Sequence, residues 1–142
     1  MKNTIFTGAA TAIVTPLNEQ GVDYESFARL IDWQIDEIVV AGTTGEGSTL
    51  TDEEHKAVIK FCVKKVAGRV PVIAGTGSND IAYAVSLTKY ACEVGADAML
   101  LVTPYYNKAT QNGLIKSFTA VADASTKPCI LYNVPSRTGC NI

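Results

Sequence analysis

The chain has 142 residues, with 12 Lys and Arg against 14 Asp and Glu and a formal net charge of −2. This length suits one domain with a substantial core, and the charge gives no electrostatic basis for binding nucleic acid or an anionic membrane. No apolar stretch is long enough to cross a membrane, and the polar N-terminus does not look like a signal peptide. We therefore expect a cytoplasmic protein.

The cysteines and the single histidine give little support for a metal site. Cys62, Cys92, Cys129 and Cys140 are widely spaced and form no Cys-x-x-Cys pair, and His55 is the only histidine. Zinc sites usually combine several such ligands at close spacing. We expect buried, reduced thiols and no metal.

Five short apolar stretches predict strands that are covered on both faces, as in a parallel sheet, because they lack polar alternation. In chain order these are Ala10–Thr15, Ile38–Ala41, Val70–Ala74, Ala98–Thr103 and Cys129–Tyr132. Amphipathic patterns between them predict four helices, over Phe27–Ile35, Val58–Val66, Ile81–Thr88 and Leu114–Ala122. A capping box at residues 51–54 and N-cap candidates at residues 78–80 mark the starts of the second and third helices.

The order βαβαβαβαβ fits two α/β architectures. A five-stranded open sheet of the flavodoxin type would be complete at this length. A (β/α)8 barrel needs about 250 residues, so the chain would carry about its first four and a half βα units. Half a barrel leaves edge strands unpaired, which favours aggregation, and the pattern alone therefore slightly favours the open sheet.

The junction between the first helix and the second strand is unusually short. The helix is predicted to run through Ile35 and the strand to begin at Ile38, which leaves only Asp36 and Glu37 between them. No glycine is available there for a left-handed helix cap, and such loops usually take 2–6 residues. We expect that several residues are missing from the sequence at this point.

Three motifs directly follow strands, and ligands of α/β proteins bind where parallel strands end. The first motif, Gly42–Thr49, is rich in glycine and can present backbone N–H groups to an anion. It lacks the lysine of a phosphate loop, and Glu46 would repel a polyanion, so a small carboxylate suits it better. A plain glycine-rich connector is the alternative.

The other two motifs carry tyrosines and an arginine. Tyr105 and Tyr106 follow the fourth strand, while Tyr132 ends the fifth and Arg137 lies just beyond it. A phenol, with a pKa near 10, transfers protons near neutral pH only through a hydrogen-bonded relay, and an arginine can bind a carboxylate with two hydrogen bonds. Each residue alone could be a packing tyrosine or a surface arginine. Their expected meeting at one edge predicts a site for a small acid.

Together the motifs resemble the dihydrodipicolinate synthase family of pyruvate-dependent lyases. The resemblance extends from Thr7 to Gly139, and its most specific segments are Gly42–Glu46, Pro71–Gly77, Thr103–Asn107 and Tyr132–Gly139. It implies that residues 1–142 are the N-terminal portion of a single (β/α)8 TIM barrel domain, in a homotetramer built as a dimer of dimers. It also implies condensation of pyruvate with L-aspartate 4-semialdehyde in lysine biosynthesis, without a cofactor.

The resemblance also assigns roles to individual residues. Thr44, with its backbone N–H, would hold the pyruvate carboxylate, and Arg137 would receive the carboxylate of the semialdehyde. Thr43, Tyr106 and Tyr132 would form a proton relay in which Tyr132 donates and accepts the proton. The family presents its equivalent of Tyr106 from the neighbouring subunit, so the dimer would complete the active site.

In the family, pyruvate forms an imine with a lysine at the end of the sixth strand. The chain ends before that strand, Lys108 lies on a polar loop, and Lys127 precedes the fifth strand at the opposite rim. We therefore expect this chain to be inactive alone. Incubation with pyruvate and borohydride should leave its mass unchanged. A stable adduct would show that the nucleophile lies elsewhere.

Some members of the family are inhibited by lysine between subunits, and the matching residues here are Ser48, His55, Asn79 and Tyr105. Tyr83 stands where inhibited relatives carry a glutamate that pairs with the amine of lysine. Because a neutral phenol replaces that charge poorly, we expect weak feedback or none.

Two other functions remain open from the sequence. One is another pyruvate aldolase, such as an N-acetylneuraminate or keto-deoxy-sugar lyase, although polyhydroxy sugars lack the second carboxylate that Arg137 would bind. The other is a non-catalytic domain of flavodoxin topology that binds a small anion. A flavin or nucleotide is not favoured, since no loop at a strand end suits phosphate.

Overall fold

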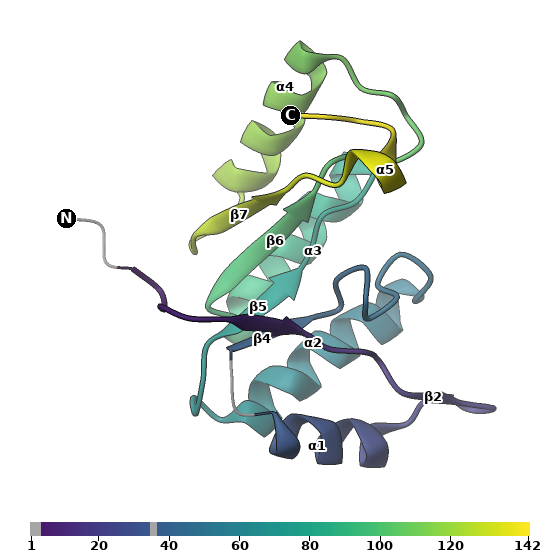
Figure 1. The fold of residues 1–142 in the computed structure, drawn as a ribbon, viewed down its shortest axis with the longest axis vertical. Helices are drawn as coiled ribbons and strands as arrows, with labels where there is room; N and C mark the ends of the chain where they lie inside the picture. The colour runs from purple at the N-terminus through teal and green to yellow at the C-terminus, as the bar shows by residue number, and fades with distance from the viewer. Residues whose placement is uncertain (1–3, 35–36) are drawn as a thin grey trace.

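The computed structural model describes residues 4–34 and 37–142. Five strands form one parallel sheet: β1 (Ala10–Ala12), β4 (Glu37–Val40), β5 (Val72–Gly75), β6 (Ala98–Val102) and β7 (Cys129–Tyr132). Four helices alternate with them: α1 (Tyr24–Trp33), α2 (Asp52–Val66), α3 (Ile81–Val94) and α4 (Gln111–Asp123). Each helix packs on the next along the side of the sheet (Figure 1).

The order of the strands decides between the two expected architectures. The strands are hydrogen-bonded in chain order, β1-β4-β5-β6-β7, and every pair is parallel. A flavodoxin-type sheet would reverse direction after its first connection, whereas sequential order is that of a (β/α)8 barrel. The barrel expectation is therefore confirmed, with the first four and a half βα units present, and the open-sheet alternative is wrong.

The central strands β4, β5 and β6 are largely buried on both faces, as their continuous apolar sequences predict, whereas the outer strands β1 and β7 are half-buried to exposed. Ile38 and Val40 of β4 face the helices and join the main core with Phe27 and Ile59. Val39 of the same strand faces the other way, into a smaller apolar cluster formed with Ile73, Ala98, Leu100 and Ile130. Because successive residues of a strand point to opposite faces, both clusters depend on one strand register.

The start of α2 follows the predicted capping box. The Thr51 hydroxyl accepts a hydrogen bond from the Glu54 N–H, and the Glu54 carboxylate accepts one from the Thr51 N–H. At α3, Asp80 is the N-cap, and its carboxylate accepts a hydrogen bond from the Tyr83 N–H. Each cap is worth about 1 kcal/mol and fixes a loop that leaves the sheet.

Several boundaries differ from the sequence expectations. Helix α1 ends at Trp33, because Gln34 is already extended at ψ 123°, and β4 begins at Glu37. The expected omission of residues falls on residues 35 and 36, which lie outside the described residues, so it stays a prediction. An unexpected hairpin joins β2 (Leu17–Asn18) to β3 (Gly21–Val22), and a short helix α5 spans Pro135–Thr138.

The cysteines are free, as expected, but only two of them are buried. Cys62 and Cys140 are buried, whereas Cys92 and Cys129 are half-buried, so the expectation of burial is wrong for these two. Burial raises the pKa of the Cys62 thiol to about 12. In the part of the chain that the structure describes, no helix is both long and apolar enough to span a membrane.

The ends of β4 and β5 approach each other so closely that two positions must be glycine. A Cβ added to Gly75 would lie inside contact distance of the carbonyl oxygen of Ala41, and a Cβ on Gly47 would meet the same oxygen. This oxygen is a backbone atom, so it cannot rotate away from an added Cβ. This packing brings the loop after β4 against the end of β5.

We predict that Gly75→Ala destabilises the protein by about 3 kcal/mol, because overpacking a closed core forces the backbone to shift. Gly42→Ala is the matched control, since its Cβ would make ordinary contacts of 3.5 Å with Val39 and 3.8 Å with Leu100. Thermal unfolding of the full-length protein, followed by circular dichroism, measures both effects. Equal midpoints for the two variants would contradict the predicted clash.

Candidate functional site

A pocket of about 200 Å³ lies at the carboxyl ends of β4 to β7. Pockets for drug-sized ligands measure ~300–1,000 Å³, so this one suits a smaller molecule. Three of the five residues predicted to be catalytic or substrate-binding line it, namely Thr43, Tyr132 and Arg137. They come from segments nearly a hundred positions apart in the sequence, and the parallel strand order brings them together.

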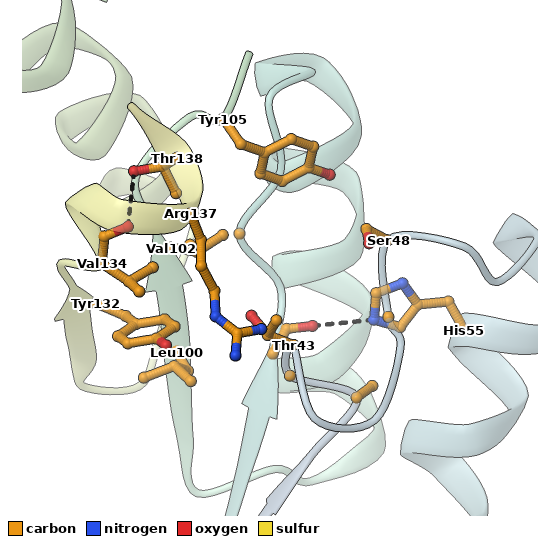
Figure 2. A pocket seen from close by; sticks show the side chains of 15 residues that line it. Thr43, Ser48, His55, Leu100, Val102, Tyr105, Tyr132, Val134, Arg137 and Thr138 are labelled. Atoms are coloured by element: carbon orange, nitrogen blue, oxygen red, sulfur yellow. Dashed lines mark hydrogen bonds between the residues drawn. The ribbon is translucent and has the colours of Figure 1, made fainter. Parts of the chain in front are cut away.

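Arg137 is presented by the short helix α5, which begins directly after β7. Thr138, the next residue, is buried; its hydroxyl accepts a hydrogen bond of 3.0 Å from Thr103 at the end of β6. Figure 2 shows the arginine side chain extending from α5 towards Thr43 and Tyr132. Within the described residues its guanidinium forms no ion pair, so both of its N–H edges are available to a carboxylate.

In the described part of the chain, the loop after β4 leaves consecutive backbone N–H groups without an acceptor, as an anion nest requires. The N–H groups of Glu46 and Gly47 close its turns on the carbonyls of Thr43 and Gly42. Among residues 4–34 and 37–142, the backbone N–H groups of Thr43, Thr44 and Gly45 have no acceptor. They therefore remain available to an anion, although the Thr44 side chain is exposed and does not line the pocket.

Two threonines that the sequence analysis missed hold this site in place. Thr15 is buried just after β1, and its hydroxyl donates a hydrogen bond of 2.7 Å to the carbonyl of Gly45. Thr103 ties β6 to α5 through Thr138, as described above. The sequence places each threonine just after an apolar strand, which could have indicated a role at the strand end. The hydrogen-bond partners, Gly45 and Thr138, are 30 and 35 positions away in the sequence.

Tyr106 does not join the pocket within one chain. Its side chain is 89% exposed, whereas its neighbour Tyr105 lines the pocket wall (Figure 2). The structure therefore brings together Thr43, Tyr132 and Arg137 and leaves Tyr106 outside. Its expected role in a neighbouring subunit stays a prediction.

A second pocket adjoins the first and contains all four residues expected to form an effector site. Ser48, His55, Asn79 and Tyr105 line it, together with Tyr83 and Asp80 among others. Ser48, His55 and Tyr105 also line the first pocket. The two pockets thus share a wall, and a change at that wall would reach both.

His55 is the buried centre of this shared wall. Its Nε2 lies 3.0 Å from the carbonyl oxygen of Gly75, and its Nδ1 lies 3.2 Å from the hydroxyl of Tyr83. A carbonyl only accepts, so Nε2 carries the proton and Nδ1 accepts the hydrogen bond from Tyr83. Burial lowers the pKa of His55 below its ordinary value, which outweighs the opposing effects of Gly75 and Asp52. The imidazole is therefore neutral.

Tyr83 is neutral as well. Burial raises its pKa to about 12, with smaller contributions from the charges of Asp52 and Tyr105. The Tyr83 phenol and the His55 imidazole, which are hydrogen-bonded to each other in the second pocket, are therefore both uncharged. Asp80 also lines this pocket, but its carboxylate already accepts the hydrogen bond from the Tyr83 N–H.

In the described residues, no group of three or more His, Cys, Asp or Glu side chains is placed to hold a metal ion. The polar groups at the first pocket are hydroxyls, backbone N–H groups, the His55 imidazole and the Arg137 guanidinium. Hydrogen-bond donors of this kind are suited to binding a carboxylate.

We predict that acid destabilises the protein through His55. The unfolded chain binds a proton on His55 near pH 6.5, while the folded chain resists it, so stability is complete above this pH and falls as the pH drops through it. His55→Gln, which keeps a donor for the Gly75 carbonyl, should reduce the fall in thermal midpoint between pH 7 and pH 5.5. The same fall in both proteins would contradict the assignment.

Comparison with known proteins supports one family. The model of the Dihydrodipicolinate synthetase family matches residues 5–142. The 4-hydroxy-tetrahydrodipicolinate synthase of Acetivibrio thermocellus is 60% identical over 146 residues, which cover 100% of this chain and 50% of that protein. The chain thus spans about half the length of the curated relatives it matches.

Solved structures agree with the sequence comparison. The dihydrodipicolinate synthase of Aquifex aeolicus superposes with a TM-score of 0.94 at 52% identity, covering 96% of this chain and 48% of that one. The chloride-inhibited enzyme of Acinetobacter baumannii, complexed with pyruvate, gives a TM-score of 0.92 at 52% identity, covering 97% and 49%. The chain belongs to the dihydrodipicolinate synthetase family.

Proposed function

We propose that this chain supplies the substrate-binding part of a 4-hydroxy-tetrahydrodipicolinate synthase, a lyase of lysine and diaminopimelate biosynthesis. The enzyme would condense pyruvate with L-aspartate 4-semialdehyde through a Schiff base. The observation that carries the proposal is the meeting of Thr43, Tyr132 and Arg137 in one small pocket. Identity of 60% to a relative of that name supports it.

The pocket groups divide the chemistry between them. The free N–H groups of Thr43 and Thr44 would bind the pyruvate carboxylate at the nest. Tyr132 would donate and accept protons during imine formation and condensation, relayed through Thr43 and Tyr106. A phenol needs such a relay, because its ordinary pKa lies near 10. Arg137 would bind the carboxylate of the semialdehyde.

The imine itself requires a lysine that loses its proton readily. Lys108 lies on an exposed loop, and Lys127 precedes β7 at the rim opposite the pocket. We therefore assign the imine to neither, and we place the nucleophile outside the residues of this chain. Residues 1–142 would then be the N-terminal portion of one barrel domain.

The assembly would complete the relay. The exposed Tyr106 would enter the pocket of a neighbouring subunit in a homotetramer built as a dimer of dimers. A cytoplasmic location, and a reaction without cofactor, nucleic acid or membrane, belong to the same proposal.

Another pyruvate aldolase is the competing function. A sialic acid or keto-deoxy-sugar lyase would also need the nest and Tyr132 for pyruvate. It would have no use for a guanidinium that is free of ion pairs among the described residues, since its second substrate has no carboxylate. Arg137 therefore favours the semialdehyde.

We predict that the full-length protein condenses pyruvate with the semialdehyde and that Arg137→Ala raises the KM for the semialdehyde about 30-fold. The loss corresponds to one charge-assisted pair of ~2 kcal/mol, and the KM for pyruvate should change little. Arg29→Ala is the control, since Arg29 pairs with Glu25 on the exposed face of α1. Initial rates with each substrate varied give both constants.

Preferred cleavage of N-acetylneuraminate by the wild-type protein would overturn the proposed substrate. Equal increases in the two KM values on Arg137→Ala would overturn the proposed role of the arginine. The two results are independent, so each part of the proposal can fail separately.

We predict that millimolar lysine inhibits the wild-type enzyme by less than half, because neutral Tyr83 cannot pair with the amine. Tyr83→Glu should introduce inhibition by lysine, whereas Tyr83→Gln should not. Both variants lose the hydrogen bond to His55, so their difference isolates the charge. Half-inhibition of the wild type, or equal behaviour of the two variants, would contradict the prediction.

A further inference from the structure

The backbone turns sharply at Tyr106, in a conformation that a tyrosine rarely adopts. Its φ is +69°, and the Asn107 N–H donates a hydrogen bond of 2.9 Å to the carbonyl of Tyr105. A bond between residues two apart, closed over a positive φ, makes a strained form of γ-turn. Such a conformation is strained and persists only where the surroundings hold it.

The turn sends two consecutive tyrosines in different directions. Tyr105 lines both pockets, whereas Tyr106 is 89% exposed. A relaxed loop could fold the second ring back onto the protein and bury apolar surface. The strained turn therefore maintains an exposed tyrosine at a defined position.

The side chain of Asn107 connects this turn to the neighbouring loop. Its Nδ2 donates a hydrogen bond of 2.9 Å to the backbone carbonyl of Asn79, and its Oδ1 receives a longer one of 3.5 Å from the Asn79 side chain. Asn79 lies on a well-fixed segment, because the next residue, Asp80, caps α3 and its N–H bonds to the Ser78 hydroxyl. Asn107 therefore ties the turn to a segment whose backbone is itself fixed.

No other side chain of the turn replaces this connection. Lys108 also has a positive φ, of +49°, and in the described part of the chain its side chain forms no ion pair. The strain at two left-handed positions, Tyr106 and Lys108, is thus opposed by the amide side chain of Asn107 between them.

We propose that Asn107 is a positioning residue, which holds the turn at Tyr106 so that the tyrosine hydroxyl reaches the active site of a second copy of this chain. The inference rests on the proposed function, in which Tyr106 acts in the proton relay of a neighbouring subunit. Asn107 touches no substrate and acts only through Tyr106.

The test is a double-mutant cycle in the full-length enzyme, with Asn107→Ala, Tyr106→Phe and the double variant. Asn107→Ala should lower kcat about tenfold, since small misplacements of catalytic groups cost at least this much, and should leave the KM for pyruvate within about twofold. In the Tyr106→Phe background the same change should cost less than about twofold, because the hydroxyl it positions is already gone.

Two further variants separate positioning from a general loss of structure. Asn107→Asp keeps the size of the side chain but lacks the N–H donor, so it should lower kcat as Asn107→Ala does. Lys108→Ala, the adjacent control, should leave kcat unchanged. Thermal midpoints and sedimentation of all variants should match those of the wild type.

The outcomes distinguish the proposed relay role of Tyr106 from the positioning role of Asn107. If Tyr106→Phe leaves kcat unchanged, the proposed relay fails and the role of Asn107 fails with it. If Tyr106→Phe lowers kcat but Asn107→Ala does not, or if Asn107→Ala costs the same in both backgrounds, only the inference about Asn107 is overturned.

Discussion

The parallel, sequential pairing of β4 to β7 is the constraint on which the site depends. Every strand in this series ends at the same edge of the sheet, so the segment after each one begins beside its neighbours. Thr43 follows β4, Tyr132 ends β7 and Arg137 lies on α5 just beyond it. A reversal of the order, as in an open flavodoxin-type sheet, would place the first of these segments away from the others.

Close backbone packing turns that shared edge into a pocket wall. Gly47 and Gly75 lie against the carbonyl of Ala41, and His55 reaches across to the carbonyl of Gly75. The imidazole, which burial keeps neutral and which accepts a hydrogen bond from the Tyr83 hydroxyl, lies between the first pocket and the second one. The same residue therefore affects both the shape of the nest loop and the chemistry that the second pocket can offer a cation.

The sequence predicted the strands well, because apolar runs are local patterns, and the motifs that follow the strands contain the three residues that meet in the first pocket. Continuous apolar runs such as residues 98–102 identify buried strands, and the Thr51–Glu54 box locates the start of α2. The hairpin of β2 and β3 was missed, since strands of two residues are too short for any periodicity. The end of α1 was placed too late because the amphipathic pattern continues past Trp33.

Other features depend on long-range contacts that no local pattern contains. The Thr15 bond to Gly45 joins residues 30 positions apart, and the turn at Tyr106 gives no signal because glycine, the usual residue at positive φ, is absent from it.

The central claim is that Thr43, Tyr132 and Arg137 surround one small keto acid. A crystal structure of the full-length protein soaked with pyruvate tests it most directly. We expect the pyruvate carboxylate on the N–H groups of Thr43 and Thr44, and the hydroxyl of Tyr132 within hydrogen-bond distance of the group on the keto carbon. Arg137 should face the space beside the bound pyruvate. Pyruvate bound in a different cavity, with these three side chains directed elsewhere, would contradict it.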